Sequence, residues 1–257
     1  MKPSDYKKIS LKIRKSILKI ANLSQCSHIG SNLSVVDVLS VLYIKFLKDK
    51  KNSFILSKGH ACLALYCVLE EMGFITKKTL NTFGKNDTIL MSHVSHKVPG
   101  INLSTGSLGH GLPVATGMAL GDKIDKIKSK IFVMLSDGEV DEGSNWESLL
   151  FSSHHKLNNL VIIIDYNKIQ SIDFVKNTLN LEPLRKKFES FGCKVLSIDG
   201  HNVVQITKAL NSKSSKPLVI IANTIKGKGV KFMENTVLWH YRSLNLVDYK
   251  KAMKIVK

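Results

Sequence analysis

Residues 136–171 read SDGEVDEGSNWESLLFSSHHKLNNLVIIIDYNKIQS, and this stretch decides the fold class. Its first residue closes the apolar run IFVMLS, and a second apolar run, LVIIIDY, follows a helix predicted over 145–156. Neither run alternates between apolar and polar residues, which is typical of strands covered on both faces of a parallel sheet. The separation of Asp137 from Asn167, 167 − 137 = 30 residues, fits one strand–helix–strand crossover. Both side chains are therefore predicted at the carboxyl edge of the same sheet.

The alternation of strands and helices extends on both sides of this stretch. Apolar runs predict strands over 53–56, 131–136, 160–166, 193–199 and 217–224. Helical periodicity predicts helices over 5–23, 33–47, 111–127, 145–156, 182–191 and 203–211, with one more ending near Gly73. Ser34 and Asp37 fit the cap and first turn of the second helix, and 85–109 reads as an ordered loop. We predict an α/β fold, doubly wound, with a mostly parallel sheet, helices on both faces and a single domain over 1–257.

The composition is that of an ordinary globular protein, with 44% hydrophobic and 23% charged residues. No apolar run reaches the ~18–20 residues that span a bilayer, and the N-terminus lacks a signal-peptide pattern. Four cysteines without a CxxC pair indicate free thiols and a cytoplasmic location. The net charge of +18 comes from scattered lysines, so we expect neither nucleic acid nor membrane as a partner.

Asp137 and Asn167 carry the oxygen ligands that Mg²⁺ prefers. Together with a backbone carbonyl they would leave coordination positions for phosphate and water oxygens. Gly138 would let the backbone approach a phosphate without a Cβ in the way. Taken alone, Asp-Gly is weak evidence for a metal site, because it is more typical of a simple turn.

The stretch 136–171 resembles the thiamine-diphosphate motif of transketolases, in which an Asp-Gly pair is followed by an Asn-containing turn. The resemblance continues in the same order along nearly the whole chain. Its further segments are SHIGSNLSVVDVLSVLY (27–43), LSKGHACLALY (56–66), PGINLSTGSLGHGLPVATGMALG (99–121), NTIKGKGVKFMEN (223–235) and Trp239-His240.

The resemblance implies two cofactors, thiamine diphosphate and Mg²⁺. Asp137 and Asn167 would bind Mg²⁺ through their side chains and Ile169 through its carbonyl. Gly138 would contact the diphosphate. The remaining cofactor contacts implied are Gly106 and Leu108 at the thiazolium end, Ile225 packed on the cofactor, and His60, His240 and Glu142.

The resemblance also assigns catalytic residues. His28, His60, His93 and His240 would converge on the reacting carbon, where imidazoles can move protons near neutral pH. Glu142, together with Glu147, is a candidate for proton coupling between active sites, although a helix N-terminal Glu is also favoured by the helix dipole. We expect structural roles for His96, His110, His154, His155 and His201.

The implied reaction transfers a two-carbon ketol unit from a ketose or ketose phosphate to an aldose or aldose phosphate. The chain stops before the pyrimidine-binding domain that carries the activating Glu in this family. We therefore expect a separate C-terminal transketolase subunit to supply that Glu, in a heterotetramer. The alternatives are a subunit related to deoxyxylulose-phosphate synthase or 2-oxo acid dehydrogenase, or a non-catalytic cofactor-binding subunit.

Three segments depart from the family pattern. Ser136 replaces the usual first Gly of the motif and would add a hydroxyl near the diphosphate. His110 stands where Gln is common. Ser92-His93-Val94 replaces the usual Gly-His-Pro, which leaves acceptor specificity open.

Overall fold

The computed structural model describes residues 2–256, in which five strands form one sheet. The strands are β1 (Ser53–Leu56), β2 (Ile131–Ser136), β3 (Leu160–Tyr166), β4 (Lys194–Asp199) and β5 (Leu218–Asn223). All neighbouring strands run parallel, in the order β1-β2-β3-β5-β4. The chain therefore builds β1, β2 and β3 side by side, passes to the edge strand β4 and returns to β5.

Both faces of the sheet are covered, which is why its central strands are apolar throughout. Every residue of β2 and β3 is buried. Along β2, Phe132 and Met134 pack into one hydrophobic core, whereas Val133 and Leu135 pack into another on the opposite face. Strand β4 lies at the edge, and only Val195 of its six residues is buried.

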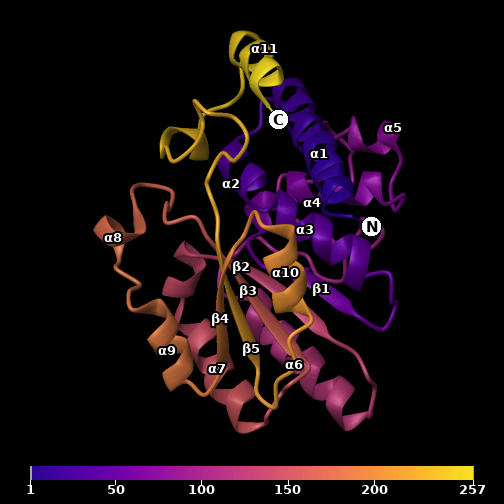
Figure 1. Cartoon of the computed structure of the whole chain (residues 1–257). Coiled ribbons are helices and arrows are strands. Elements are labelled where there is room, and N and C mark those ends of the chain that lie inside the picture. The colour runs from indigo at the N-terminus through magenta and orange to yellow at the C-terminus, as the bar shows by residue number, and fades with distance from the viewer. Residues whose placement is uncertain (1, 257) are drawn as a thin grey trace.

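Helices cover each face, as Figure 1 shows. The core that contains Phe132 includes residues of α1 (Pro3–Ser24), α2 (Ile29–Ser34), α3 (Val36–Val41), α4 (Cys62–Glu71) and α10 (Val203–Leu210). The core that contains Val133 includes residues of α6 (Gly111–Ile124), α7 (Gly143–His154) and α9 (Leu184–Ser190). The predicted doubly wound α/β fold is confirmed. The shorter helices α5 (Lys77–Leu80) and α8 (Val175–Thr178) and the last helix, α11 (Leu246–Ile255), were not predicted.

The prediction of one helix over 33–47 is wrong, because the helical segment begins earlier and is broken. The chain forms α2, then α3, and then a π-helical turn at Leu42–Phe46. Ser34 does not cap a helix, because its hydroxyl is buried and donates to the Asp165 carboxylate on β3 (2.7 Å). Asp37 does lie in the first turn of α3, but its carboxylate binds Arg14 and His201.

Two expectations from composition can be compared with the described part of the chain. Cys26, Cys62, Cys67 and Cys193 are all free thiols there. Among residues 2–256, no helix combines the length and apolar character needed to cross a membrane.

The carboxyl edge of the sheet positions the functional side chains. The chain leaves β1 into Ser57-Lys58, β2 into Asp137, β3 into Asn167 and β5 into Thr224. Because parallel strands end at the same edge, residues far apart in sequence meet there.

Candidate active site

A cavity of about 250 Å³ lies at this carboxyl edge. Most of the predicted site residues line it, whereas Glu142 and Ile225 do not. The predicted residues in its wall are His28, His60, His93, Gly106, Leu108, Asp137, Gly138, Asn167, Ile169 and His240. Ser31, Lys58, Ser136, Gln170 and Ser171 also line it.

Asp137 and Asn167 line the same cavity, as the strand spacing predicted. Asp137 is 2% exposed and accepts backbone N–H bonds from Gly138 (2.9 Å) and Lys168 (2.6 Å). Burial, and then the charge of Asp165, raise the pKa of Asp137 to about 6. A buried carboxylate of this kind is stabilised by a cation placed beside it.

The other predicted magnesium ligands also present oxygen atoms. The side-chain oxygen of Asn167 accepts the Ile169 N–H (3.2 Å), and its amide donates to Asp165 (3.1 Å). The Ile169 carbonyl accepts one bond from Lys226 (2.9 Å), which leaves its second lone pair. Within residues 2–256, no cluster of three or more His, Cys, Asp or Glu side chains could hold a metal. This donor set therefore fits Mg²⁺ only where ligand oxygens, such as those of a diphosphate, complete the coordination.

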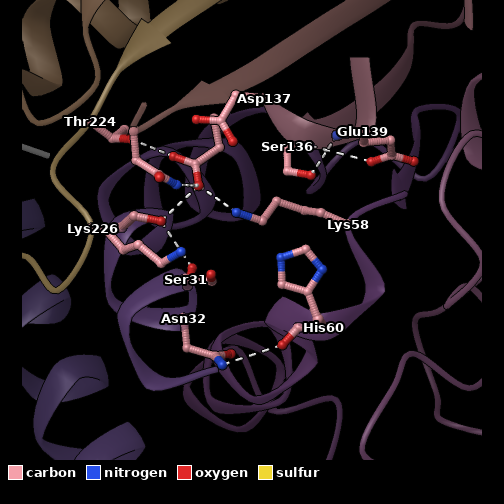
Figure 2. Close-up of polar contacts among 12 residues, drawn as sticks. Ser31, Asn32, Lys58, His60, Ser136, Asp137, Glu139, Thr224 and Lys226 are labelled. Carbon is pink, nitrogen blue, oxygen red and sulfur yellow. Dashed lines mark hydrogen bonds and ion pairs between the residues drawn. The ribbon is translucent and has the colours of Figure 1, made fainter. Parts of the chain in front are cut away.

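Lys58 is a buried cation that our sequence analysis missed. Its side chain is fully buried and forms an ion pair with Asp165. Asp165 also accepts hydrogen bonds from Ser34 and Thr224. Figure 2 shows the side chains of Lys58 and Thr224, with dashed lines for their polar contacts. Burial alone would raise the pKa of Asp165, but the charge of Lys58 and these hydrogen bonds lower it.

Lys226 is a second buried cation that our sequence analysis missed. Its ammonium group donates to the carbonyls of Ile169 (2.9 Å) and Gln170 (3.0 Å) and lies 2.9 Å from Nδ1 of His240. Burial is the main cause that lowers the pKa of Lys226 to about 8. The signal available in the sequence was a lysine shortly beyond each of two strand ends, at 58 and 226.

The four predicted catalytic histidines form a cluster, with His28 near each of the other three. The centroid of its ring lies 4.8 Å from that of His240, 5.4 Å from that of His60 and 6.3 Å from that of His93. Burial is the largest cause that lowers the pKa of His28 to about 4, of His240 to about 3 and of His60 well below its usual value. Lys58 and Lys226 lower all three further. These three imidazoles are therefore neutral at neutral pH, and the same effects make them weaker bases than a free imidazole.

The backbone fixes His28 in an unusual conformation. Its φ of 63° lies in the left-handed region, which residues other than Gly adopt at a cost in backbone energy. The His28 N–H donates to the His240 carbonyl (2.7 Å), and the amide of Asn32 donates to the His28 carbonyl (2.8 Å). Nδ1 of His28 lies 2.8 Å from the Ser27 hydroxyl, which orients the ring.

Ser136, which stands where the family pattern has Gly, uses its added hydroxyl in a hydrogen bond to a nearby residue. The Ser136 hydroxyl accepts the backbone N–H of Glu139 (3.2 Å) while the residue lines the cavity.

Glu139 was not predicted as a site residue. Its fully buried carboxylate accepts bonds from Ser57, Gly109 N–H (3.0 Å) and Ser136 N–H (3.3 Å). It joins the segments after β1 and β2 to the loop before α6.

Glu142 and Ile225 lie outside the cavity wall. Glu142 is exposed at the residue before α7, against Gly109. Glu147, on α7, is also exposed. Ile225 is half-buried, and its N–H donates to Nε2 of His201 (2.9 Å). The cofactor contacts predicted for Glu142 and Ile225 thus remain predictions.

The chain matches the family model described as "Transketolase, thiamine diphosphate binding domain" over residues 7–255. It is 42% identical over 240 residues to an apulose-4-phosphate transketolase subunit of Actinobacillus succinogenes, covering 89% of this chain and 87% of that protein. It is 36% identical over 253 residues to "6-deoxy-6-sulfo-D-fructose transketolase subunit SqwG" of Clostridium sp., covering 94% of this chain and 92% of that protein.

This chain spans less than half the length of some other relatives. Human "Transketolase" is 34% identical over an alignment of 257 positions, which covers 95% of this chain and 41% of the human protein. The crystal structure of transketolase from Campylobacter jejuni superimposes with a TM-score of 0.93 at 30% identity. That match covers 99% of this chain and 43% of the other.

Proposed function

The chain belongs to the transketolase family, whose thiamine-diphosphate-binding domain it contains, and we propose that it is the cofactor-binding subunit of a two-chain transketolase. The proposed complex transfers a two-carbon ketol unit from a ketose to an aldose. One observation supports this most: a single cavity gathers His28, His60, His93 and His240 with Asp137 and Asn167.

The residues at the carboxyl edge fit the implied cofactors. Asp137, Asn167 and the Ile169 carbonyl would hold Mg²⁺, as the resemblance implied. Gly138 would let the diphosphate approach the backbone, and Lys58 and Lys226 would neutralise its charge. Gly106 and Leu108 would lie at the thiazolium end, with Ile225 as a further contact. When bound, thiamine diphosphate supplies the electron sink for cleavage beside the ketose carbonyl.

The histidines supply the proton transfers that ketol transfer needs. Neutral imidazoles of His28, His60 and His240 can accept a proton from a sugar hydroxyl as the donor is cleaved. They can return a proton to the aldehyde oxygen of the acceptor.

The partner would be a C-terminal subunit that supplies the activating Glu. Three relatives whose names call them transketolase subunits are each covered over 87–92% of their length, which supports a two-chain arrangement. We propose two copies of each chain in the complex. The exposed Glu142 and Glu147 would lie between copies and couple their protons, because adjacent carboxylates share protons.

The donor would be a ketose that carries an anionic group. The names of two relatives specify a sugar phosphate and a sulfonated sugar. The net charge of +18 would attract such substrates. The cytoplasmic location stays a prediction.

The test has two parts. First, the chain is combined with its partner, and ketol transfer is assayed with thiamine diphosphate, Mg²⁺, a ketose phosphate donor and an aldose acceptor. We expect transfer from the complex and none from this chain alone. Turnover by this chain alone would contradict the two-chain proposal, and use of pyruvate in place of the ketose would favour the deoxyxylulose-phosphate synthase alternative.

Second, calorimetry measures binding of thiamine diphosphate with Mg²⁺ to the chain. Asp137→Asn should weaken binding strongly, and the exposed Asp87→Asn is the matched control. Equal affinity in wild type and Asp137→Asn would rule out Asp137 as a metal ligand.

A further inference from the structure

A cavity of about 410 Å³ lies beside the edge strand β1. It shares no lining residue with the cavity that holds the four histidines. We call it the Tyr43 cavity, and its wall includes Tyr43, Lys48, Lys50, Ser53, Phe54 and Phe74. Its volume is that of a small-molecule site. A molecule bound here would therefore be separate from the cofactors and the sugar.

The Tyr43 side chain is buried, but its hydroxyl has no partner. Tyr43 is 4% exposed, and its oxygen makes no hydrogen bond within residues 2–256. The oxygen is not closed off from solvent, because the unpartnered oxygens of that kind in the described chain belong to four other residues. It therefore opens onto the cavity that Tyr43 lines. Buried hydroxyls are normally hydrogen-bonded, so this one is available to a ligand.

Aromatic neighbours hold the Tyr43 ring in place. Its centroid lies 5.9 Å from that of Phe54 and 6.3 Å from that of Phe74, both edge to face. Phe74 packs in turn on Gly100, where a Cβ would lie 2.7 Å from the Phe74 ring. Tyr43 also belongs to the π-helical turn Leu42–Phe46, and such turns are frequent at functional sites. The wall is thus preformed, and its rings favour a flat apolar ligand.

The charged part of the wall is cationic. Lys48 and Lys50 line the cavity, both are exposed, and neither forms an ion pair within residues 2–256. None of the described lining residues is Asp or Glu, since Asp49 lies outside the wall. Ser53 and Asn102 add a hydroxyl and an amide that make no hydrogen bond in the described chain. A carboxylate or phosphate would therefore find two unpaired cations and neutral donors.

We propose that the Tyr43 cavity is a second ligand site, which binds a small organic anion with an aromatic body. The aromatic body packs against Phe54 and Phe74. The anionic group lies at Lys48 and Lys50, and an oxygen of the ligand accepts a hydrogen bond from Tyr43. This site goes beyond the proposed function and does not depend on it, because it uses no residue of the cavity at the sheet edge.

The test measures binding of phenylacetate to this chain and to the two-chain complex. Phenylacetate carries both proposed features, whereas 2-phenylethanol lacks the charge and acetate lacks the ring. Ligand-detected saturation-transfer NMR gives the affinities, and the amide signals of Gly100 and Asn102 in the free chain locate the site. We expect a Kd of roughly 1–10 mM for phenylacetate, as for other ligands of this size, and weaker binding of both analogues.

Two changes in the protein test the contacts. Tyr43→Phe should weaken phenylacetate binding roughly two- to tenfold, the value of one net hydrogen bond. It should not lower the urea midpoint, because the lost hydroxyl has no partner in the fold. Lys48→Gln combined with Lys50→Gln should weaken phenylacetate binding roughly two- to tenfold and leave 2-phenylethanol within about twofold. Lys7→Gln combined with Lys8→Gln is the matched control, since these exposed lysines of α1 lie outside the cavity wall.

Four results would overturn the site. One is the absence of phenylacetate binding in the millimolar range, and another is an affinity that neither change lowers. An equal loss in the Lys7 and Lys8 control would assign the effect to net charge. Binding to the free chain that disappears in the two-chain complex would show that the partner covers the cavity.

Discussion

His201 and Asp37 share a hydrogen bond that fixes the tautomer of the histidine. Nδ1 of His201 lies 2.7 Å from Oδ2 of Asp37, while Nε2 accepts the backbone N–H of Ile225 (2.9 Å). Because Nε2 accepts, the proton of the neutral ring sits on Nδ1 and points at the carboxylate. Arg14 binds the same carboxylate with two nitrogens and donates to the Lys228 carbonyl (3.2 Å). Through His201 and Arg14, Asp37 thus holds the backbone at Ile225 and Lys228, on either side of Lys226.

Asp37→Asn should destabilise the protein by about 3–5 kcal/mol at pH 7, because it leaves the buried Arg14 without its counter-charge. Burial alone would raise the pKa of Asp37, but the hydrogen bond from His201 and the charge of Arg14 hold it below its usual range. A lowered carboxyl pKa stabilises the fold above the unfolded value of about 3.9, and this stabilisation is lost as the pH falls below it. Urea unfolding at pH 7 measures the difference.

The matched control is Asp199→Asn, since Asp199 is an exposed carboxylate at the end of β4 whose one hydrogen bond among residues 2–256 comes from the His201 N–H. It should cost much less than Asp37→Asn. Equal losses from the two substitutions would contradict the role given to Asp37.

Lys58 and Asp165 should stabilise the fold only as a pair. Both side chains are buried, so Lys58→Met leaves an unpaired carboxylate and should cost about 3–5 kcal/mol. Adding Asp165→Asn removes that charge, so the double variant should be more stable than Lys58→Met alone. Urea unfolding of the two single variants and the double variant measures the coupling. A double variant no more stable than Lys58→Met would show that the buried charge is not the cause.

The sequence predicted the parts of the site that follow from strand ends. Asp137 and Asn167 were placed together by the spacing of two apolar runs, and the structure brings both into one cavity. The strands over 53–56, 131–136 and 160–166 were also predicted with the bounds observed. A continuous apolar run can be recognised in the local sequence and predicts a buried strand. In a parallel sheet, the residue that follows each strand then lies at the carboxyl edge.

Other features depend on contacts that no local pattern encodes. His28 and His240 are distant in sequence, and only the family resemblance joined them before their rings were found 4.8 Å apart. Lysines are exposed in most proteins, so Lys58 and Lys226 gave no sign of burial. The break between α2 and α3 was missed because Ser34 binds Asp165 on a strand far along the chain.

The half-buried His28 and His240 should titrate far below the usual range. Their neutral form is favoured in the folded state, where burial lowers the pKa of His28 to about 4 and of His240 to about 3. Between pH ~6.5 and ~4 these histidines are protonated in the unfolded chain but stay neutral in the folded chain. The free energy of unfolding should therefore fall as the pH drops. Imidazole C–H signals followed by NMR give the pKa values of the folded chain directly, and the urea-unfolded chain is the reference. A midpoint near 6.5 for His28 in the folded chain would contradict this prediction.

Lys226→Met should weaken binding of thiamine diphosphate with Mg²⁺ by tenfold or more. The buried ammonium group lies among the Ile169 and Gln170 carbonyls, beside the predicted magnesium ligands, where a charged hydrogen bond to phosphate contributes ~1.5–3 kcal/mol. Inorganic pyrophosphate with Mg²⁺ isolates the phosphate contribution, and calorimetry measures both ligands. Lys228→Met is the matched control, because Lys228 lies on the same loop but outside the cavity wall. An equal loss in both variants would assign the effect to the loop as a whole, and an unchanged affinity for pyrophosphate would remove Lys226 from the diphosphate site.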